Sequence, residues 1–342
     1  MLQGRTSILV TGGAGYIGSH TVLALLDAGY HVIVLDDLST GFRWAVDARA
    51  GFVEGGVQNE SLVRGIIQRH NVRAVMHFAG SIIVTESVAD PLKYYRNNTA
   101  ASRSLIDSAV TCGVPHFVFS STAAVYGLPA QVPIPETTAL QPINPYGMSK
   151  LMTEIMLADA AAAHGLNFCA LRYFNVAGAD SQLRSGQSTR GTTHLIKVAV
   201  EAVLGKRSHV DVFGTDYATP DGTGVRDYIH VSDLADAHVA ALNALVVQPG
   251  RNLWLNCGYG VGFSVFEVLD MVEEVTNVRI KRKLSERYAG DPAMLIADSR
   301  AILESISWRP KHADLEHIVR DAFRWEMRLS TTSGFRLERD AI

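Results

Sequence analysis

Three glycines near the N-terminus constrain the fold of this chain more than any other feature. Gly12, Gly15 and Gly18 follow an apolar run at residues 7–10, which predicts a strand, and precede a stretch at 20–28 with helical spacing. In such a turn one glycine permits the bend, one lets a pyrophosphate approach the backbone, and one lets the helix pack against the strand. The amides and the dipole at the helix N-terminus then favour a phosphate. The segment therefore predicts the dinucleotide-binding turn of a strand–helix–strand unit.

An acid stands where this kind of turn needs one. Asp36 follows the next apolar run, residues 31–35, and is itself followed by Asp37. A carboxylate at the end of that strand accepts hydrogen bonds from the adenosine ribose hydroxyls and repels a 2′-phosphate. We therefore predict that the cofactor is NAD rather than NADP. The residues expected to hold it in this unit are Gly12, Gly15, Tyr16, Ile17, Gly18, Asp36, Asp37 and Leu38.

The first half of the chain alternates short apolar runs with amphipathic stretches. The runs at 74–78 and 116–120 predict further strands, and the stretches at 61–69 and 98–112 predict helices. Short strands that are apolar throughout and are separated by helices are typical of a parallel sheet covered on both faces. The predicted fold class is α/β, with a Rossmann-type doubly wound parallel sheet and a smaller C-terminal α/β lobe that binds the substrate.

The regular alternation weakens near residue 175, which we take as the end of the first unit. We expect residues 1–175 to form the NAD-binding domain and residues 176–342 to form mainly the second lobe, with some segments returning to the first domain. A mobile loop is expected at 180–190, which is rich in Ser, Gly, Gln and Arg. The helices expected in this part span residues 193–204, 232–246, 264–275 and 315–327.

The composition excludes several classes of function. The chain has 31 Lys and Arg against 34 Asp and Glu, a formal net charge of −3, so it lacks the basic balance typical of nucleic-acid binding. Its three cysteines, Cys112, Cys169 and Cys257, form neither a disulfide framework nor a zinc pattern. We therefore expect no metal, nucleic-acid or membrane partner. The lack of an apolar leader or membrane-spanning segment favours a cytoplasmic protein.

A Tyr–Lys pair and a group of hydroxyls point to proton transfer. Tyr146 and Lys150 are four residues apart at the start of a predicted helix, so they share one face. A phenol with a pKa of about 10 is a poor base at neutral pH, but a neighbouring ammonium and a cationic nicotinamide both favour the phenolate. Upstream, the run 120–122 ends an apolar strand with hydroxyls, and one of them can orient a substrate alcohol beside Tyr146. The predicted catalytic residues are Tyr146, Lys150 and Thr122.

Taken together, these motifs resemble a known family. The glycine turn, the strand-end hydroxyls and Tyr-x-x-x-Lys are similar to those of the extended short-chain dehydrogenase/reductases. The resemblance is closest to the UDP-glucose 4-epimerase family and extends from about residue 8 to about residue 325. The runs that carry it are VTGGAGYIGS at 10–19, YYRNNT at 94–99, SSTAAVYG at 120–127, LRYFN at 171–175 and DGTGVRDYIH at 221–230.

The resemblance implies interconversion of UDP-glucose and UDP-galactose on bound NAD, an isomerisation without net redox change. Tyr146 would take the proton of the sugar 4-hydroxyl as hydride leaves C4, and the resulting 4-keto sugar would turn within the site and take hydride back on its other face. Thr122 would hydrogen-bond the sugar oxygen, while Lys150 would hold the nicotinamide ribose and tune Tyr146. A homodimer formed through two helices of each subunit, near residues 98–108 and 149–163, is also implied.

Further site residues follow from the resemblance. Those expected around NAD are Gly56, Val57, Phe78, Ala79, Gly80, Ile82, Asn97 and Phe174, in addition to Tyr146 and Lys150. Those expected around the UDP-sugar are Asn175, His194, Leu195, Val212, Phe213, Arg226, Arg287, Tyr288, Asp291 and Leu295, in addition to Thr122 and Tyr146. Arg226 would pair with the diphosphate, because a guanidinium suits phosphate geometry.

Four positions depart from the family pattern. Gly56 stands where an acid usually contacts the adenine amine, so weaker retention of NAD is expected. Tyr288 stands where a second phosphate-binding Arg is usual, with Arg287 one residue earlier, which leaves open whether Arg287 reaches the phosphate. Ile82 replaces a Lys that would contact the cofactor, and His194 replaces an Asn of the substrate site.

Alternatives to this reaction remain open at the level of sequence. Leu295 aligns with the position whose side-chain size decides which 2-substituent of the sugar fits. Because leucine is of intermediate size, epimerisation of UDP-N-acetylhexosamine stays open. A UDP-pentose 4-epimerase differs only in a substrate that lacks the C6 group. A nucleotide-sugar dehydratase normally carries Asp-Glu after the Thr, where Ala123 and Ala124 stand and cannot exchange protons. A non-catalytic NAD-binding regulator would be expected to have lost Tyr146 or Lys150.

Overall fold

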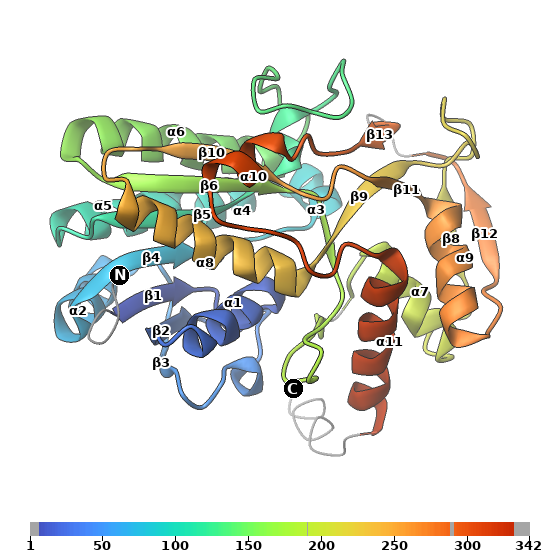
Figure 1. The fold of residues 1–342 in the computed structure, drawn as a ribbon, viewed down its shortest axis with the longest axis horizontal. Helices are drawn as coiled ribbons and strands as arrows, with labels where there is room; N and C mark the ends of the chain where they lie inside the picture. Colours follow the sequence, from blue (N-terminus) through green and yellow to red (C-terminus); the bar gives the residue numbers. More distant parts are fainter. Residues whose placement is uncertain (1–6, 190, 288–290, 332–342) are drawn as a thin grey trace.

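The computed structural model describes residues 7–189, 191–287 and 291–331. A seven-stranded sheet runs through the larger part of the molecule in the order β10-β6-β5-β4-β1-β2-β3, and every neighbouring pair in it is parallel (Figure 1). This arrangement confirms the predicted parallel sheet. Its strands are β1 (Ser7–Thr11), β2 (His31–Asp36), β3 (Gly51–Glu54), β4 (Val72–His77), β5 (His116–Thr122), β6 (Asn167–Tyr173) and β10 (Leu253–Cys257).

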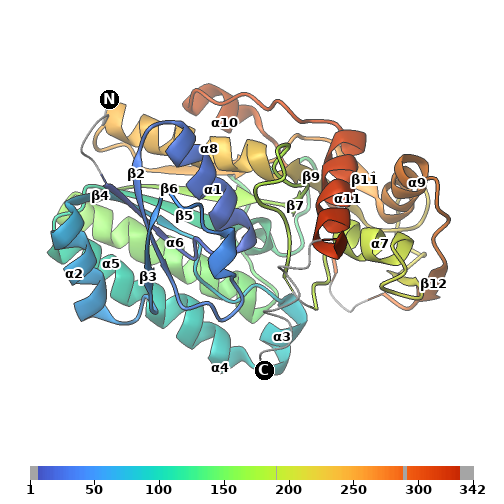
Figure 2. The same cartoon turned by 90° about the horizontal axis from the view of Figure 1, so that it is seen from below.

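Helices cover both faces of this sheet, as strands that are apolar on both sides require. α1 (Tyr16–Asp27) and α8 (Val231–Val247) pack on one face, and α2 (Glu60–His70), α5 (Ala101–Thr111) and α6 (Pro145–His164) pack on the other (Figure 2). Two buried apolar cores result, one on each side of the sheet. Because β10 and α8 come from the second half of the chain, that half completes one edge and one face of the sheet.

Local sequence signals account for the limits of the long helix α6. Asn144 precedes it, and its side-chain oxygen accepts the backbone N–H of Gly147 at 2.8 Å, which satisfies one of the amides left over at a helix start. Pro145 occupies the first turn, where its missing N–H has no cost. Gly165 ends the helix in the left-handed conformation, with a φ of +69°. None of the helices in the described part of the chain is long and apolar enough to cross a bilayer.

The smaller lobe has a core of its own. α7 (Leu195–Val203), α9 (Val265–Thr276) and α11 (Leu315–Thr331) pack together beside two small sheets. One sheet pairs β8 (Val210–Phe213) with β12 (Arg282–Ser285), and the other consists of β7 (Asn175–Ala177), β9 (Val225–His230), β11 (Gly262–Ser264) and β13 (Met294–Leu295). The remaining elements are η1 (Arg43–Ala45), α3 (Val84–Ala89), α4 (Pro91–Tyr94), η2 (Tyr95–Ala100), η3 (Ala123–Tyr126) and α10 (Arg300–Ser305).

The polar segment expected to be a mobile loop is packed against the first domain instead. Ser185 is fully buried, and its hydroxyl lies 2.7 Å from that of Ser19 in α1. Arg184 donates to Asp180 at 2.7 Å and to Asp27 of α1 at 2.8 Å. The same Ser and Arg content that suggests mobility therefore supplies the contacts that fix the described part of this segment.

A buried carboxylate joins three segments of the smaller lobe. Asp227, in β9, has no exposed surface, and its two oxygens accept the backbone N–H groups of Tyr259, Gly260 and Ala297 at 3.0, 2.9 and 3.2 Å. Burial raises the pKa of Asp227 to about 6, although these hydrogen bonds act to lower it. Asp227 therefore holds β9, the chain after β10 and the chain after β13 together at a cost in desolvation.

Asp227 is expected to make the protein less stable as the pH rises from about 4 to about 7. A folded-state pKa near 6 against 3.8 in the unfolded chain means that the folded state binds more protons in this range, so the contribution of Asp227 falls through it by about 2–3 kcal/mol. The measurement is urea unfolding of the wild type and Asp227→Asn at several pH values. The wild type should lose stability relative to the variant as pH rises, and a constant difference between them would contradict the assignment.

Candidate active site

The predicted glycine turn lies against the end of β4. Gly12 has a φ of +71°, and a Cβ there would lie 2.5 Å from the backbone nitrogen of Ala79. A Cβ on Gly18 would lie 2.2 Å from the carbonyl oxygen of Gly12. A side chain at either position would force the turn off the neighbouring strand or the helix off the turn. α1 follows with Gly15 as its N-cap and with no side-chain cap, which is the kind of helix start that suits a phosphate.

The predicted ribose-binding acid also holds the turn together. One oxygen of Asp36 accepts the backbone N–H of Ala14 at 2.9 Å, and the other accepts that of Leu38 at 2.8 Å. Leu38 has a φ of +58°, so the chain bends sharply just after β2. Asp36 is nearly buried, and desolvation raises its pKa. The exposed Asp37 accepts from the backbone and side chain of Ser39.

A π-helix brings the predicted Asn97 to the chain that follows β4. Residues 98–100 of the helix predicted at 98–112 belong instead to η2, whose π geometry is common at functional sites, and α5 follows from Ala101. Within it, Asn97 donates to the hydroxyl of Ser81 at 3.2 Å, and the oxygen of Asn98 accepts the backbone N–H of Ser81 at 2.7 Å. The residues just before, Phe78, Ala79 and Gly80, continue β4 past the glycine turn, whereas the side chain of Ile82 is half exposed.

The structure places Gln58 beside Gly56, one of the positions that depart from the family pattern. An ideal Cβ on Gly56 would lie 2.3 Å from the side-chain oxygen of Gln58 and 2.4 Å from its nitrogen. The carboxamide of Gln58 therefore occupies the space beside Gly56 into which an acid at that position would project. Val57, between them, is buried. Sequence reasoning missed Gln58, because nothing in the spacing of a Gly-x-Gln run shows that the side chain folds back.

The three predicted catalytic residues lie together at the junction of β5 and α6. Thr122 ends β5, and its hydroxyl lies near enough to the phenol of Tyr146, in the first turn of α6, to lower the pKa of that phenol. Lys150 lies one turn further along α6 and is almost fully buried. Its ammonium donates to the carbonyl oxygen of Ser120 at 2.8 Å and lies 5.0 Å from the centre of the Phe119 ring.

Desolvation acts on the phenol and the ammonium in opposite directions. It raises the pKa of Tyr146, and the nearby Thr122 hydroxyl partly offsets this. It lowers the pKa of Lys150 to about 8, so the ammonium stays mostly charged at neutral pH and loses its proton only above it. A phenol in this site therefore becomes a useful base only when further positive charge is brought beside it.

A second group of predicted residues lies where β9 and β13 meet. The guanidinium of Arg226 donates to the carboxylate of Asp291 at 2.8 Å, and Leu295 pairs with Arg226 in the parallel register of the two strands. Phe174 and Leu295 belong to one apolar cluster around the buried Tyr126, just beyond Thr122. The structure thus brings Arg226, Asp291 and Leu295 together and places Leu295 on the side of the catalytic residues. Asn175 lies in β7, opposite Tyr228 of β9.

The other predicted substrate residues lie around α7 and β8. His194 and Leu195 stand at the start of α7, which packs on β8, the strand that contains Val212 and Phe213. Arg287 follows β12 beside Phe213; its guanidinium lies 3.1 Å from the carboxylate of Asp216 and 5.2 Å from the ring centre of Tyr217. His194 hydrogen-bonds the side chain of Gln187. Tyr288 lies outside the described residues.

One group of side chains in the described part of the chain has the composition of a cation site. His230, His317 and Asp321 offer ligand atoms within 4.8 Å of one another. However, Nδ1 of His230 accepts the backbone N–H of Ser232 at 3.1 Å, so the ring proton of the neutral imidazole lies on Nε2, the atom that faces Asp321. A protonated nitrogen cannot bind a cation. This group is therefore better described as a buried His–Asp contact, with Nε2 of His230 3.5 Å from Asp321, than as a set of metal ligands.

The sequence of the chain matches a known family model. Residues 8–256 match the model of the NAD dependent epimerase/dehydratase family. A UDP-glucose 4-epimerase from Azospirillum brasilense is 55% identical over 327 residues, which cover 96% of this chain and 94% of the relative.

Solved structures agree with this match. A UDP-glucose 4-epimerase from Brucella ovis in complex with NAD is 43% identical, with a TM-score of 0.90 over 93% of this chain and 98% of the other. The corresponding enzyme from Bifidobacterium longum, in complex with NAD+ and UDP, is 35% identical, with a TM-score of 0.89 over 94% of this chain and 98% of the other. Matches of this length and identity establish that the chain belongs to the NAD dependent epimerase/dehydratase family.

Proposed function

We propose that this chain is an NAD-dependent isomerase that interconverts UDP-glucose and UDP-galactose. One observation of the structure carries the proposal: Thr122, Tyr146 and Lys150 lie together at the carboxyl edge of the sheet that also bears the glycine turn, with Lys150 bonded to the carbonyl oxygen of Ser120. The relatives that share most of the chain support it, since the one from Azospirillum brasilense, at 55% identity, is a UDP-glucose 4-epimerase.

The glycine turn has the form that NAD requires. The space that a Cβ would fill at Gly12 and Gly18 is already taken by backbone, so the turn offers amides instead of side chains to a pyrophosphate. NAD, when bound, accepts a hydride from the sugar C4 and returns it. The residues proposed to hold it are Gly12, Gly15, Tyr16, Ile17, Gly18, Asp36, Asp37, Leu38, Gly56, Val57, Phe78, Ala79, Gly80, Ile82, Asn97, Tyr146, Lys150 and Phe174.

Tyr146 is the residue proposed to accept the proton of the sugar 4-hydroxyl. The Thr122 hydroxyl lies beside the phenol of Tyr146 at the strand end and favours the phenolate. Lys150 keeps a buried positive charge one turn away and donates to the carbonyl oxygen of Ser120. When the sugar binds, its 4-oxygen takes the place of one of the groups now next to the phenol, and the phenolate of Tyr146 accepts the proton of the 4-hydroxyl. Tyr146 later returns that proton to the same oxygen of the epimer.

The two parts of the chain divide the ligand between them. Residues 1–175 are proposed to bind NAD, and residues 176–342 mainly the UDP-sugar, with β10 and α8 returned to the first domain. Arg226 is the proposed diphosphate partner, and Leu295 the wall beside the sugar. The remaining proposed substrate residues are Thr122, Tyr146, Asn175, His194, Leu195, Val212, Phe213, Arg287, Tyr288 and Asp291.

Replacing Tyr146 by Phe should abolish most of the activity and leave substrate binding intact. The variant loses the acid–base group and keeps the ring, so kcat for UDP-galactose should fall by about 10²- to 10⁴-fold. The measurement is turnover of UDP-galactose to UDP-glucose without added NAD, with UDP binding followed by calorimetry. Tyr30→Phe, which removes a remote exposed hydroxyl, is the matched control. A Tyr146→Phe variant that retained wild-type kcat would sink the assignment.

Gln58 is expected to make the adenine contact that Gly56 cannot make. Removing its carboxamide in Gln58→Ala should weaken NAD binding by about 5- to 10-fold, the value of one hydrogen bond. Adding Gly56→Asp to that variant should restore binding, because the acid then enters the vacated space. NAD titration and retention of NAD through gel filtration measure both effects. Gln68→Ala, at the other end of α2, is the control; unchanged NAD affinity in Gln58→Ala would contradict the prediction.

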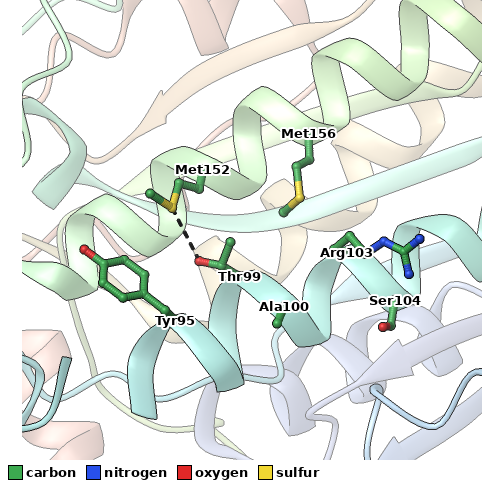
Figure 3. Close-up of a pocket in the computed structure, with 7 residues that line it drawn as sticks. All are labelled: Tyr95, Thr99, Ala100, Arg103, Ser104, Met152 and Met156. Atoms are coloured by element: carbon green, nitrogen blue, oxygen red, sulfur yellow. Dashed lines mark hydrogen bonds between the residues drawn. The ribbon is translucent and has the colours of Figure 1, made fainter. Parts of the chain in front are cut away.

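A homodimer is the proposed assembly, and an apolar groove between two helices supports it. η2 and α5 form one side of the groove and α6 the other, with Met152 and Met156 directed across it (Figure 3). Thr99 donates to the sulfur of Met152 at 3.8 Å. Beside the groove Ile155, on the same helix as both methionines, is half exposed. Exposed apolar side chains on two adjacent helices are typical of a helix-packing interface.

A charge beside this groove should separate the subunits. Ile155→Glu should sediment as a monomer at concentrations where the wild type sediments as a dimer, because the carboxylate would be buried without a partner. Val247→Glu, which places the same charge on an exposed apolar position at the end of α8, should leave the dimer intact. Sedimentation equilibrium measures both, and a wild-type monomer would refute the assembly.

A further inference from the structure

A buried ion pair lies below the catalytic residues and takes no part in the chemistry described above. Glu154 of α6 and Arg172 of β6 are only 2% and 3% exposed. One oxygen of Glu154 accepts from Nε of Arg172 at 3.0 Å, and the other accepts from a terminal nitrogen at 2.6 Å. This two-bonded geometry fixes the relative orientation of the two side chains as well as their distance.

The pair completes a row of contacts between α6 and the end of β5. The hydroxyl of Thr122 lies beside the phenol of Tyr146, and the carbonyl oxygen of Ser120, two residues earlier in β5, accepts from Lys150. Between these two strand residues stands Ser121, whose hydroxyl donates to the carboxylate of Glu154. Tyr146, Lys150 and Glu154 follow one another at intervals of four along one face of α6. Three successive residues of the strand thus hold three successive turns of the helix.

The other end of the pair reaches the wall of the sugar site. Arg172 donates to the hydroxyl of Tyr126 at 3.0 Å, and Tyr126 donates to the side chain of Asn256 at 2.7 Å. Asn256 in turn donates to the carbonyl oxygen of Ile134 at 2.7 Å. Tyr126 and Ile134 belong to the apolar cluster that contains Leu295. The network therefore connects the proton-transfer helix to the residue proposed to line the sugar.

We propose that Glu154 is a positioning residue for proton transfer, and this inference rests on the proposed epimerase function. Held by Arg172 and Ser121, it fixes the register of α6 on β5, so that the phenol of Tyr146 and the ammonium of Lys150 keep one spacing from Thr122. Buried ion pairs are often no more stabilising than apolar side chains of the same volume. Geometry therefore accounts for this pair better than stability does.

Two variants separate positioning from stability. In Ser121→Ala the ion pair stays and only its link to β5 is lost, so the melting temperature should change little while kcat for UDP-galactose falls by about 10-fold. In Glu154→Leu/Arg172→Met both charges are replaced by apolar groups, so stability should approach that of the wild type. In this double variant kcat should fall by about 10²-fold, because a displacement near 1 Å is enough for such a loss. The KM for UDP-galactose should stay within about two-fold of the wild-type value.

A matched control comes from the smaller lobe. Glu273 is also buried and pairs with Arg279 and Arg282, but it is remote from α6. Glu273→Gln should lower the melting temperature and leave kcat unchanged. The proposal is overturned if Ser121→Ala has wild-type kcat, or if the double variant is both stable and fully active. A wild type that fails to turn over UDP-galactose refutes the proposed function itself, which is measured before any variant is compared.

Discussion

The approach of Gly12 to the backbone of Ala79 is the contact on which the rest of the site depends. β1 and β4 are neighbours in a parallel sheet, so the turns that follow them must share the same narrow edge. Only a residue without a Cβ allows these turns to touch, and the carboxylate of Asp36 then holds the glycine turn from the side of β2. The result is a glycine turn that presents backbone in place of side chains to a cofactor, while the side chains proposed for proton transfer come from β5 and α6.

Charge is used sparingly throughout the site. The chain is close to neutral, yet its proposed ligands are anionic. Arg226 is already bonded to Asp291, so an incoming diphosphate would compete with a carboxylate for it. Arg172 is neutralised by Glu154, and Lys150 is held by a carbonyl oxygen. We therefore expect the backbone amides of the glycine turn to bind the pyrophosphate of NAD in place of free cations, and the diphosphate of the UDP-sugar to depend on Arg226.

The fold and the central chemistry were predictable because both depend on short-range patterns. Apolar runs and glycine spacing predict the parallel sheet, and the four-residue spacing of Tyr146 and Lys150 puts them on one helix face. What the sequence does not reveal depends on how distant segments meet. Gln58 folds back over Gly56, and Arg172 reaches Glu154 across a strand and a helix. The segment predicted to be mobile is packed for the same reason, since its partner Ser19 is far away in the chain. The same spacing argument could have predicted that Glu154 shares this helix face, because it lies four residues after Lys150.

The π-helix η2 makes the length of one segment as important as its residues. A π turn contains more residues than an α turn and is usually seen as a single inserted residue within a helix. Losing one residue between Tyr95 and Ala100 would let this turn relax to α geometry and rotate the preceding chain by about 100° relative to α5. Asn97 and Asn98, which now both bond Ser81, would then face different directions. Descendants of this chain can gain or lose residues in surface loops, but a deletion here would detach the chain after β4 from its support.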